Sequence, residues 1–190
     1  MEKMMSRPIE YNLDEVLDKA MDIFWEKGYT GVSMADIVKY TGLNRRTMYS
    51  LFQDKEGLFK ETLDYYYTKL SQKKLLILKE NPGKKGIEIL LNTFTFAENF
   101  KGCLFSNSIR EKDFVTTETF EIPKKFFVQL QNGLEENLKQ AQKAGDFSGD
   151  IHGMALTIIS VIHGFHVYGK YNHTKDDSNA LFKNVIDMIK

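Results

Sequence analysis

The sequence has few of the residues that would indicate a disulfide-rich or all-β protein. Its 190 residues include one cysteine, Cys103, which excludes a disulfide framework and a cysteine-based zinc site. The 3 prolines and 13 glycines are fewer than the many turns of an all-β chain would need. The N-terminus lacks the apolar stretch of a secretory signal, and the longest apolar run, around residues 158–162, is far shorter than a membrane span. We therefore expect an all-α protein located in the cytoplasm.

The sequence also has no net charge, but its charged residues are unevenly distributed along the chain. The 26 basic and 26 acidic side chains give a net charge of zero, which taken alone disfavours nucleic acid as a partner. Residues 10–27 nevertheless carry a net charge of −4, whereas residues 39–60 carry +3. A neutral protein with one local basic face can still dock on phosphates, so residues 39–60 are a candidate nucleic-acid surface.

Apolar spacing and cap residues predict helices from the start of the chain. Between residues 13 and 25 the apolar positions fall on one helical face, with Asn12 as the cap and Gly28 as the end. Shorter helices are expected at residues 33–40 and 45–52. A fourth helix is expected to run unbroken over residues 55–79, because neither Gly nor Pro follows Gly57 there.

The rest of the chain also has helical patterns, separated by clear breaks. Asn81-Pro82-Gly83 is the strongest break, and Pro123 suits the first turn of a helix that Gly145 ends. The expected helices cover residues 84–100, 104–111, 123–144, 150–169 and 176–190. Together these segments predict an all-α fold of about nine helices.

Two short helices joined by a turn with glycine form a helix-turn-helix. Gly42 can take the positive φ that the sharp turn needs at no steric cost. The second helix begins with Asn44, Arg45, Arg46 and Thr47, and Tyr49 follows one turn later. Arginine matches a guanine edge or a phosphate, and a helix N-terminus attracts phosphate, as a recognition helix requires. An exposed arginine pair is also common on helices that touch no DNA, so the spacing alone leaves both interpretations open.

A dense set of residues between Phe24 and Leu58 matches one known domain. These residues are Gly28-Tyr29, Val32-Ser33-Met34, Asp36-Ile37, Thr41-Gly42-Leu43-Asn44, Thr47-Met48-Tyr49, Phe52, Asp54-Lys55-Glu56 and Leu58. They resemble the DNA-binding domain of the TetR family of bacterial transcriptional regulators. The block Lys101-Gly102-Cys103-Leu104, with Asn107 and Glu111, resembles one subset of that family. Asn44 stands where serine is common, and both residues cap helices well.

The resemblance implies a sequence-specific DNA-binding regulator, a homodimeric repressor that a small apolar or aromatic ligand releases from a pseudo-palindromic, double-stranded operator. It implies a helix-turn-helix domain at residues 8–54, with the recognition helix at about 44–52. Residues 55–190 would form a helical ligand-binding domain that dimerises through its last two long helices. The implied DNA contacts are Ser33, Asn44, Arg45, Arg46, Thr47, Tyr49 and Lys55.

The C-terminal half is rich in aromatic residues, which could surround a ligand. The candidate pocket residues are Phe94, Phe105, Phe126, Phe127 and His163. An aromatic run at helical spacing is more often core than pocket, so a filled core is the alternative. The apolar face from Ile151 to Phe165 is wide enough to serve both the core and a partner protomer.

No catalytic or cofactor motif is present in the sequence. A glycine-rich phosphate loop and a Ser/His/Asp signature are both missing, so neither an enzyme nor a cofactor is predicted. His163 and His166 lie three residues apart, with Cys103 and His152 elsewhere, and a metal half-site is conceivable but not predicted. Two alternatives stay open: a small-molecule-binding helical enzyme, and a helix-turn-helix module that binds another protein. DNA binding should weaken steeply with salt, whereas catalysis need not.

Overall fold

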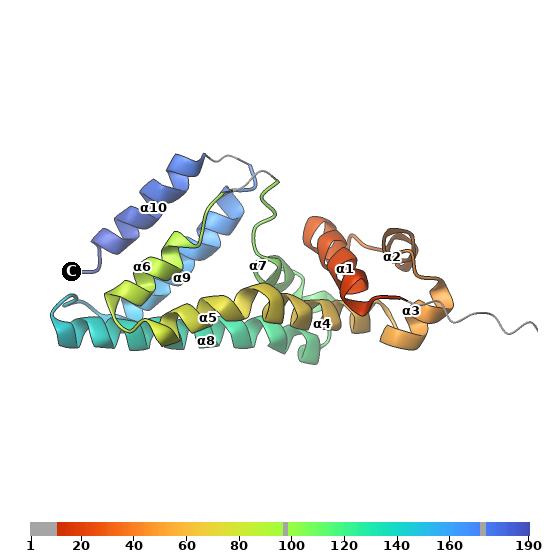
Figure 1. The fold of residues 1–190 in the computed structure, drawn as a ribbon, viewed down its shortest axis with the longest axis horizontal. Coiled ribbons are helices and arrows are strands. Elements are labelled where there is room, and N and C mark those ends of the chain that lie inside the picture. Colours follow the sequence, from red (N-terminus) through yellow and green to blue (C-terminus); the bar gives the residue numbers. More distant parts are fainter. Residues whose placement is uncertain (1–10, 97–98, 172–173) are drawn as a thin grey trace, which may run out of the picture.

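The computed structural model consists of helices arranged in two parts that share one long helical rod (Figure 1). The structure describes residues 11–96, 99–171 and 174–190. Its α-helices are α1 (Leu13–Lys27), α2 (Met34–Thr41), α3 (Arg45–Phe52), α4 (Lys55–Tyr66), α5 (Gln72–Glu80), α6 (Lys84–Asn92), α7 (Leu104–Ile109), α8 (Thr117–Ala144), α9 (Ile151–Tyr168) and α10 (Lys175–Asp187). A π-helical segment, η1 (Tyr67–Ser71), joins α4 to α5, and a short 3-10 helix, η2 (Lys112–Phe114), precedes α8. Every regular element in the described ranges is helical, so the predicted all-α class is confirmed.

The first three helices begin at the predicted cap residues. The side chain of Asn12 accepts a hydrogen bond from the Asp14 amide, and Gly28 ends α1 with a φ of 75°. Ser33 caps α2 through a reciprocal capping box with Asp36. Each of these caps is a local interaction, which is why the sequence is sufficient to predict it. Residues 8–10 of the predicted DNA-binding domain lie outside the described residues.

The core of the N-terminal part continues into α4. The ring of Phe59 is 1% exposed, and its centroid lies 4.9 Å from that of Phe24 and 5.0 Å from that of Tyr29. Leu58 is fully buried beside them. Residues of α4, past the predicted domain boundary at residue 54, thus contribute to the core that holds the helix-turn-helix.

Gly42 adopts the conformation that the sequence predicts for the turn between α2 and α3. Its φ of 78° and ψ of 2° lie in the left-handed region, which only glycine reaches without steric cost. A Cβ atom at this position would meet no heavy atom within 4 Å, so space is not limiting. The requirement for glycine is thus one of backbone conformation alone.

Substitution of Gly42 by valine is therefore expected to lower the free energy of unfolding by about 1–3 kcal/mol, because a β-branched residue is strained at positive φ. Urea denaturation followed by circular dichroism measures this change. Gly42→Asn is the matched control, since asparagine tolerates the left-handed region and should cost less than valine. Equal stability of Gly42→Val and the parent protein would contradict the role assigned to this turn.

The long rod predicted for residues 55–79 is present, with one irregularity. The helical run passes from α4 through η1 into α5 and ends at Glu80. The π-helical segment Tyr67–Ser71 interrupts the α-helical hydrogen bonding where the rod leaves the N-terminal part. Such segments occur frequently at functional sites, and nothing in the residue pattern of this stretch predicts one.

The predicted start of the 123–144 helix is wrong. Helix α8 begins at Thr117, six residues earlier, and Pro123 lies inside it. The side chain of Thr116 caps the helix, and Thr116 is itself held by Glu56 from α4. A contact between residues 60 positions apart thus sets the boundary, and no local pattern reveals it.

The helix predicted at residues 84–100 is also too long. Helix α6 ends at Asn92, where the hydroxyl of Thr93 donates to the carbonyl of Leu90. The chain then leaves the helix so that its aromatic side chains can join a cluster around α9. In that cluster Phe96 stacks on Phe165 with ring centroids 4.3 Å apart.

Helix α9 is more apolar than the sequence analysis anticipates. With 18 residues and a mean hydropathy of 1.3, it is long and apolar enough to cross a membrane, as is the core helix of many soluble proteins. One of its faces is buried in the protein, through Ala155, Ile158, Ile162 and Phe165. The opposite face is open, with Leu156 43% and Val167 54% exposed. The buried face packs against α8, which makes α9 a core helix with one unpartnered side.

Candidate nucleic-acid interface

The exposed side of α3 presents two arginines and a tyrosine. Met48 is fully buried and Phe52 is 6% exposed, so these two residues anchor the inner face of the helix. Arg45 and Arg46 are exposed in the first turn, and Tyr49 is 45% exposed one turn later. Neither guanidinium group forms a hydrogen bond or an ion pair within the described ranges. Both groups are therefore available to an external acceptor.

Two predicted DNA contacts, Asn44 and Ser33, serve as helix caps. The Oδ1 atom of Asn44 accepts a hydrogen bond of 2.9 Å from the Thr47 amide. The Oγ atom of Ser33 accepts from the Asp36 amide at 3.1 Å and donates to the Asp36 carboxylate at 2.5 Å. Hydrogen bonds from Ser33 hold the pKa of Asp36 below its ordinary value, so this carboxylate stays charged. A negative charge beside Ser33 disfavours the phosphate contact that the sequence analysis expects from it.

Lys55 is engaged inside the protein. Its Nζ atom donates to the carbonyl oxygens of Tyr29 and Val32 at 3.0 and 3.1 Å, and it lies 4.1 Å from the centroid of the Tyr29 ring. Two of the three ammonium donors are thereby used to fix the segment between α1 and α2 against α4. At most one donor is left for a phosphate. We therefore assign Lys55 mainly a positioning role. Backbone carbonyls as acceptors leave no signal in a sequence.

Glu111 connects the N-terminal part to the end of α7. Its Oε2 atom accepts a hydrogen bond from the Tyr29 amide at 2.8 Å. Its Oε1 atom accepts from the amide and the hydroxyl of Thr30 at 2.9 and 2.6 Å. No role for Glu111 is predicted from the sequence, where it stands out only as part of the block at residues 101–111. A single carboxylate thus holds the turn that follows α1.

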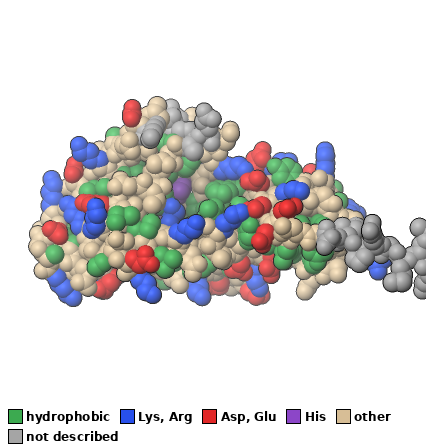
Figure 2. All heavy atoms as spheres, in the orientation of Figure 1, with side chains coloured by type: hydrophobic (Ala, Val, Ile, Leu, Met, Phe, Trp, Pro, Cys, Tyr) green, Lys and Arg blue, Asp and Glu red, His purple; other side chains and the backbone are tan. Residues whose placement is uncertain are grey.

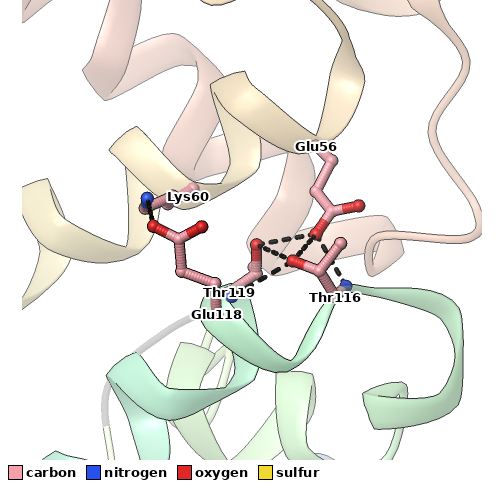
Figure 3. A network of polar contacts seen from close by, with 5 residues as sticks. All are labelled: Glu56, Lys60, Thr116, Glu118 and Thr119. Carbon is pink, nitrogen blue, oxygen red and sulfur yellow. Dashed lines mark hydrogen bonds and ion pairs between the residues drawn. The ribbon is translucent and has the colours of Figure 1, made fainter.

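A second polar network joins α4 to the start of α8 (Figure 3). The Oε1 atom of Glu56 accepts from the amide and hydroxyl of Thr116 at 2.7 and 2.5 Å, and from the Thr119 hydroxyl at 2.7 Å. Partial burial alone would raise the pKa of Glu56, but these hydrogen bonds outweigh it and lower the pKa. Beside them Lys60 forms an ion pair with Glu118. The two networks fix the orientation of the helix-turn-helix relative to the C-terminal helices.

Comparison with known proteins agrees with this arrangement. The model of the family described as "Bacterial regulatory proteins, tetR family" matches residues 16–62, which run from α1 into α4. Over these residues the chain matches the TetR family. The HTH-type transcriptional repressor ComR of Escherichia coli is 28% identical over 173 residues, covering 87% of this chain and 82% of ComR. The biofilm operon regulator IcaR of Staphylococcus aureus is 24% identical over 91% of this chain and 77% of IcaR.

Solved structures have the same fold over nearly the whole chain. The TetR-family regulator CifR, in complex with a 26 bp double-strand operator DNA, superposes with a TM-score of 0.80 at 23% identity, covering 97% of this chain and 100% of CifR. A TetR-family regulator from Agrobacterium tumefaciens gives a TM-score of 0.81 at 17% identity, covering 93% and 96% of the two chains. The family fold therefore extends over the C-terminal helices, which the family model leaves unmatched.

The predicted pocket residues fall into two aromatic clusters. The rings of Phe105, Phe126, Phe127 and His163 follow one another with centroid distances of 5.2, 5.2 and 4.6 Å. Phe94 lies in a separate cluster, where it packs against Phe165, His166 and Phe182 at 5.9, 5.6 and 5.6 Å. The rings within each cluster are in van der Waals contact, as in a filled core. A pocket at these residues stays a prediction that requires the rings to move apart.

The candidate metal ligands are not grouped together. His152 pairs with Glu135 at 2.8 Å at the start of α9, and the Nδ1 atom of His163 lies 3.1 Å from the Ser106 hydroxyl. His166 is buried among aromatic rings, and burial lowers its pKa to about 3. The thiol of Cys103 accepts a hydrogen bond from the Tyr66 hydroxyl at 3.4 Å. In the described part of the chain, no cluster of three or more histidine, cysteine or acidic side chains could hold a metal ion.

Proposed function

We propose that this protein is a homodimeric transcriptional repressor that binds a pseudo-palindromic operator through α3 and leaves it when a small ligand binds. The observation that carries the proposal is the unpaired arginine pair at the start of α3, on the second helix of a helix-turn-helix. ComR and IcaR are named as a repressor and a negative regulator, and CifR is seen on operator DNA, which supports the same role here.

In the proposed complex the N-terminal turn of α3 enters the major groove. Arg45 and Arg46 reach guanine edges or flanking phosphates, and the Tyr49 hydroxyl donates a hydrogen bond to a phosphate. Asn44 and Ser33 act mainly through the helices that they cap, and Thr47 lies half-buried at the edge of the contact. Two protomers related by a two-fold axis would present two such helices to successive major grooves.

Selection from random DNA duplexes tests the DNA-binding function. The expected result is an enriched inverted repeat, bound with an affinity that falls steeply as salt concentration rises, since phosphate contacts release counterions. Enrichment of no inverted repeat would contradict the proposal. Binding with little salt dependence would favour one of the two alternatives, a protein-binding module or a small-molecule-binding enzyme.

The open side of α9 is the proposed dimer surface. Between α9 and α10 lies an apolar groove of about 450 Å³, lined by Phe96, Val161, Gly164, Phe165, Tyr168, Asp177 and Leu181. Leu156 and Val167 are further exposed apolar residues on α9. Ile158 and Ile162 face the core of the protomer, because they are 0% and 2% exposed. An apolar groove with exposed apolar residues on the same helix commonly marks a protein–protein contact.

Substitution of Leu156 by glutamate is expected to convert the dimer to a monomer, because the carboxylate would lose its hydration in the interface without a partner. Sedimentation velocity at micromolar concentration measures the change, and operator affinity should fall with it. Val128→Glu is the matched control, since Val128 is a similarly exposed apolar residue (51%) on α8. A wild-type monomer, or dimers of both variants, would contradict the assignment.

We propose that the rod from α4 to α5 transmits the effect of ligand binding to the recognition helix. It starts beside α3 and ends among the C-terminal helices (Figure 1). At its midpoint Tyr66 packs on Trp25 of α1 and on Phe105 of α7, with centroid distances of 5.1 and 4.8 Å. A ligand that parts the rings near Phe105 would shift Tyr66, and with it the spacing of the two recognition helices.

A thermal-shift screen of apolar and aromatic metabolites, followed by titration with and without operator, tests this route. By reciprocity the operator must weaken ligand binding by the factor by which the ligand weakens operator binding, typically about 5- to 150-fold. Ligands that stabilise the protein but leave DNA affinity unchanged would contradict the switch while leaving the DNA-binding function intact.

A further inference from the structure

A hollow of about 330 Å³ opens where the N-terminal part meets α7 and the end of α9. Its walls are formed by Trp25, Glu26, Lys27, Gly28, Asn107, Arg110, Glu111 and Lys170. In Figure 2, Lys and Arg side chains lie near the middle of the face drawn, and Asp and Glu side chains lie beside them toward the position of α1 in Figure 1. The hollow is separate from α3 and from the two aromatic clusters, and neither the DNA contact nor the proposed ligand pocket uses it.

None of the three cations on its wall, Lys27, Arg110 and Lys170, forms an ion pair with a carboxylate in the described part of the chain. The guanidinium of Arg110, at the end of α7, makes no hydrogen bond or ion pair within the described ranges. The Nζ atom of Lys170 donates to the neutral Oδ1 atom of Asn107 at 2.9 Å. Partial burial, and then the nearby Arg110, lower the pKa of Lys170. The protein thus holds two like charges near each other without neutralising them.

The acidic residues at the hollow only partly offset these charges. Both oxygens of Glu111 are occupied by the three donors of Tyr29 and Thr30. Glu26 is exposed next to Lys27, so the lining contains three cations and two carboxylates. The indole Nε1 atom of Trp25 is buried and has no hydrogen-bond acceptor. The guanidinium of Arg110 and the indole N–H of Trp25 are thus donors without an acceptor, and the lining carries one more cation than carboxylates.

We propose that this hollow binds a small molecule that carries an oxyanion, held between Arg110 and Lys170. A guanidinium group offers two parallel N–H donors that match a carboxylate or a phosphate, and Lys170 adds a second charge. The volume is at the lower end of the range for small-molecule pockets, and the indole of Trp25 supplies an apolar wall beside the charge. The site does not rest on the proposed DNA function, because its test contains no DNA.

Trp25 is the only tryptophan in the chain, so its fluorescence reports on this hollow. The full-length protein is titrated with cyclohexanecarboxylate, sulfate and inorganic phosphate, each at constant ionic strength set with sodium chloride. The expected result is a saturable change in emission with at least one of the three. Saturation by cyclohexanecarboxylate alone identifies an organic carboxylate, whereas saturation by sulfate or phosphate identifies a tetrahedral oxyanion.

Arg110→Gln and Lys170→Gln are each expected to weaken the saturable binding by about 10-fold or more, because each removes one charge-assisted hydrogen bond to the anion. Both residues are exposed, so neither substitution should prevent folding. Lys112→Gln is the matched control, because it removes one exposed charge two residues from Arg110 without touching the lining. Absence of saturation with all three anions would overturn the proposal. So would a loss in Lys112→Gln as large as that in Arg110→Gln.

Discussion

Replacement of both Arg45 and Arg46 by alanine is expected to weaken specific operator binding by on the order of 100-fold or more. Each arginine that pairs with a guanine edge contributes about 1–3 kcal/mol of discrimination, and a factor of ten requires about 1.4 kcal/mol. The side chains are exposed and unpaired in the free protein, so their removal disrupts no internal contact. The loss should therefore appear in DNA binding and leave the thermal unfolding temperature nearly unchanged.

Fluorescence anisotropy with the selected duplex and with an unrelated duplex measures this effect. Lys139→Ala combined with Lys143→Ala is the charge-matched control, because both lysines are exposed on α8 at a distance from α3. The control should lose little affinity. If the two double variants bind equally well, long-range attraction rather than α3 would carry the binding, and the proposed recognition helix would be wrong.

Most of the N-terminal part could be predicted because its signals are local. The side chains of Asn12, Ser33, Asn44 and Asp54 each cap the helix that follows them within three residues. Gly42 takes the positive φ that its position requires. The apolar residues of these short helices also recur at the spacing that places them inside. A pattern contained in a few neighbouring residues is visible in a sequence.

The contacts that join the two parts could not be predicted, because their partners are far apart in the chain. Glu111 binds Tyr29 and Thr30 across more than 80 positions, and Glu56 binds Thr116 across 60. Lys55 is drawn to main-chain carbonyls, which every residue has. The aromatic clusters of the C-terminal half also depend on contacts between distant residues. The sequence therefore does not show that Phe94 and Phe105 belong to different clusters.

Phe59 provides the second large expected effect, because it closes the core of the helix-turn-helix from α4. Substitution by alanine should lower the free energy of unfolding by about 3–5 kcal/mol, the usual cost of removing a buried phenylalanine. The ring is 1% exposed and contacts Phe24 and Tyr29 at centroid distances of 4.9 and 5.0 Å, so the cavity would lie between α1 and α4. Operator affinity should fall as well, since α3 is positioned on the same core.

Urea denaturation of Phe59→Ala measures this loss, with Phe114→Ala as the control. Phe114 is also a phenylalanine but is 64% exposed, so its replacement should change the stability by less than about 0.5 kcal/mol. The comparison decides where the DNA-binding unit ends. A loss below about 1 kcal/mol for Phe59→Ala would mean that the first three helices close their own core. A loss of the expected size would place the first turns of α4 inside that unit, so that a tilt of the rod must move α3 with it.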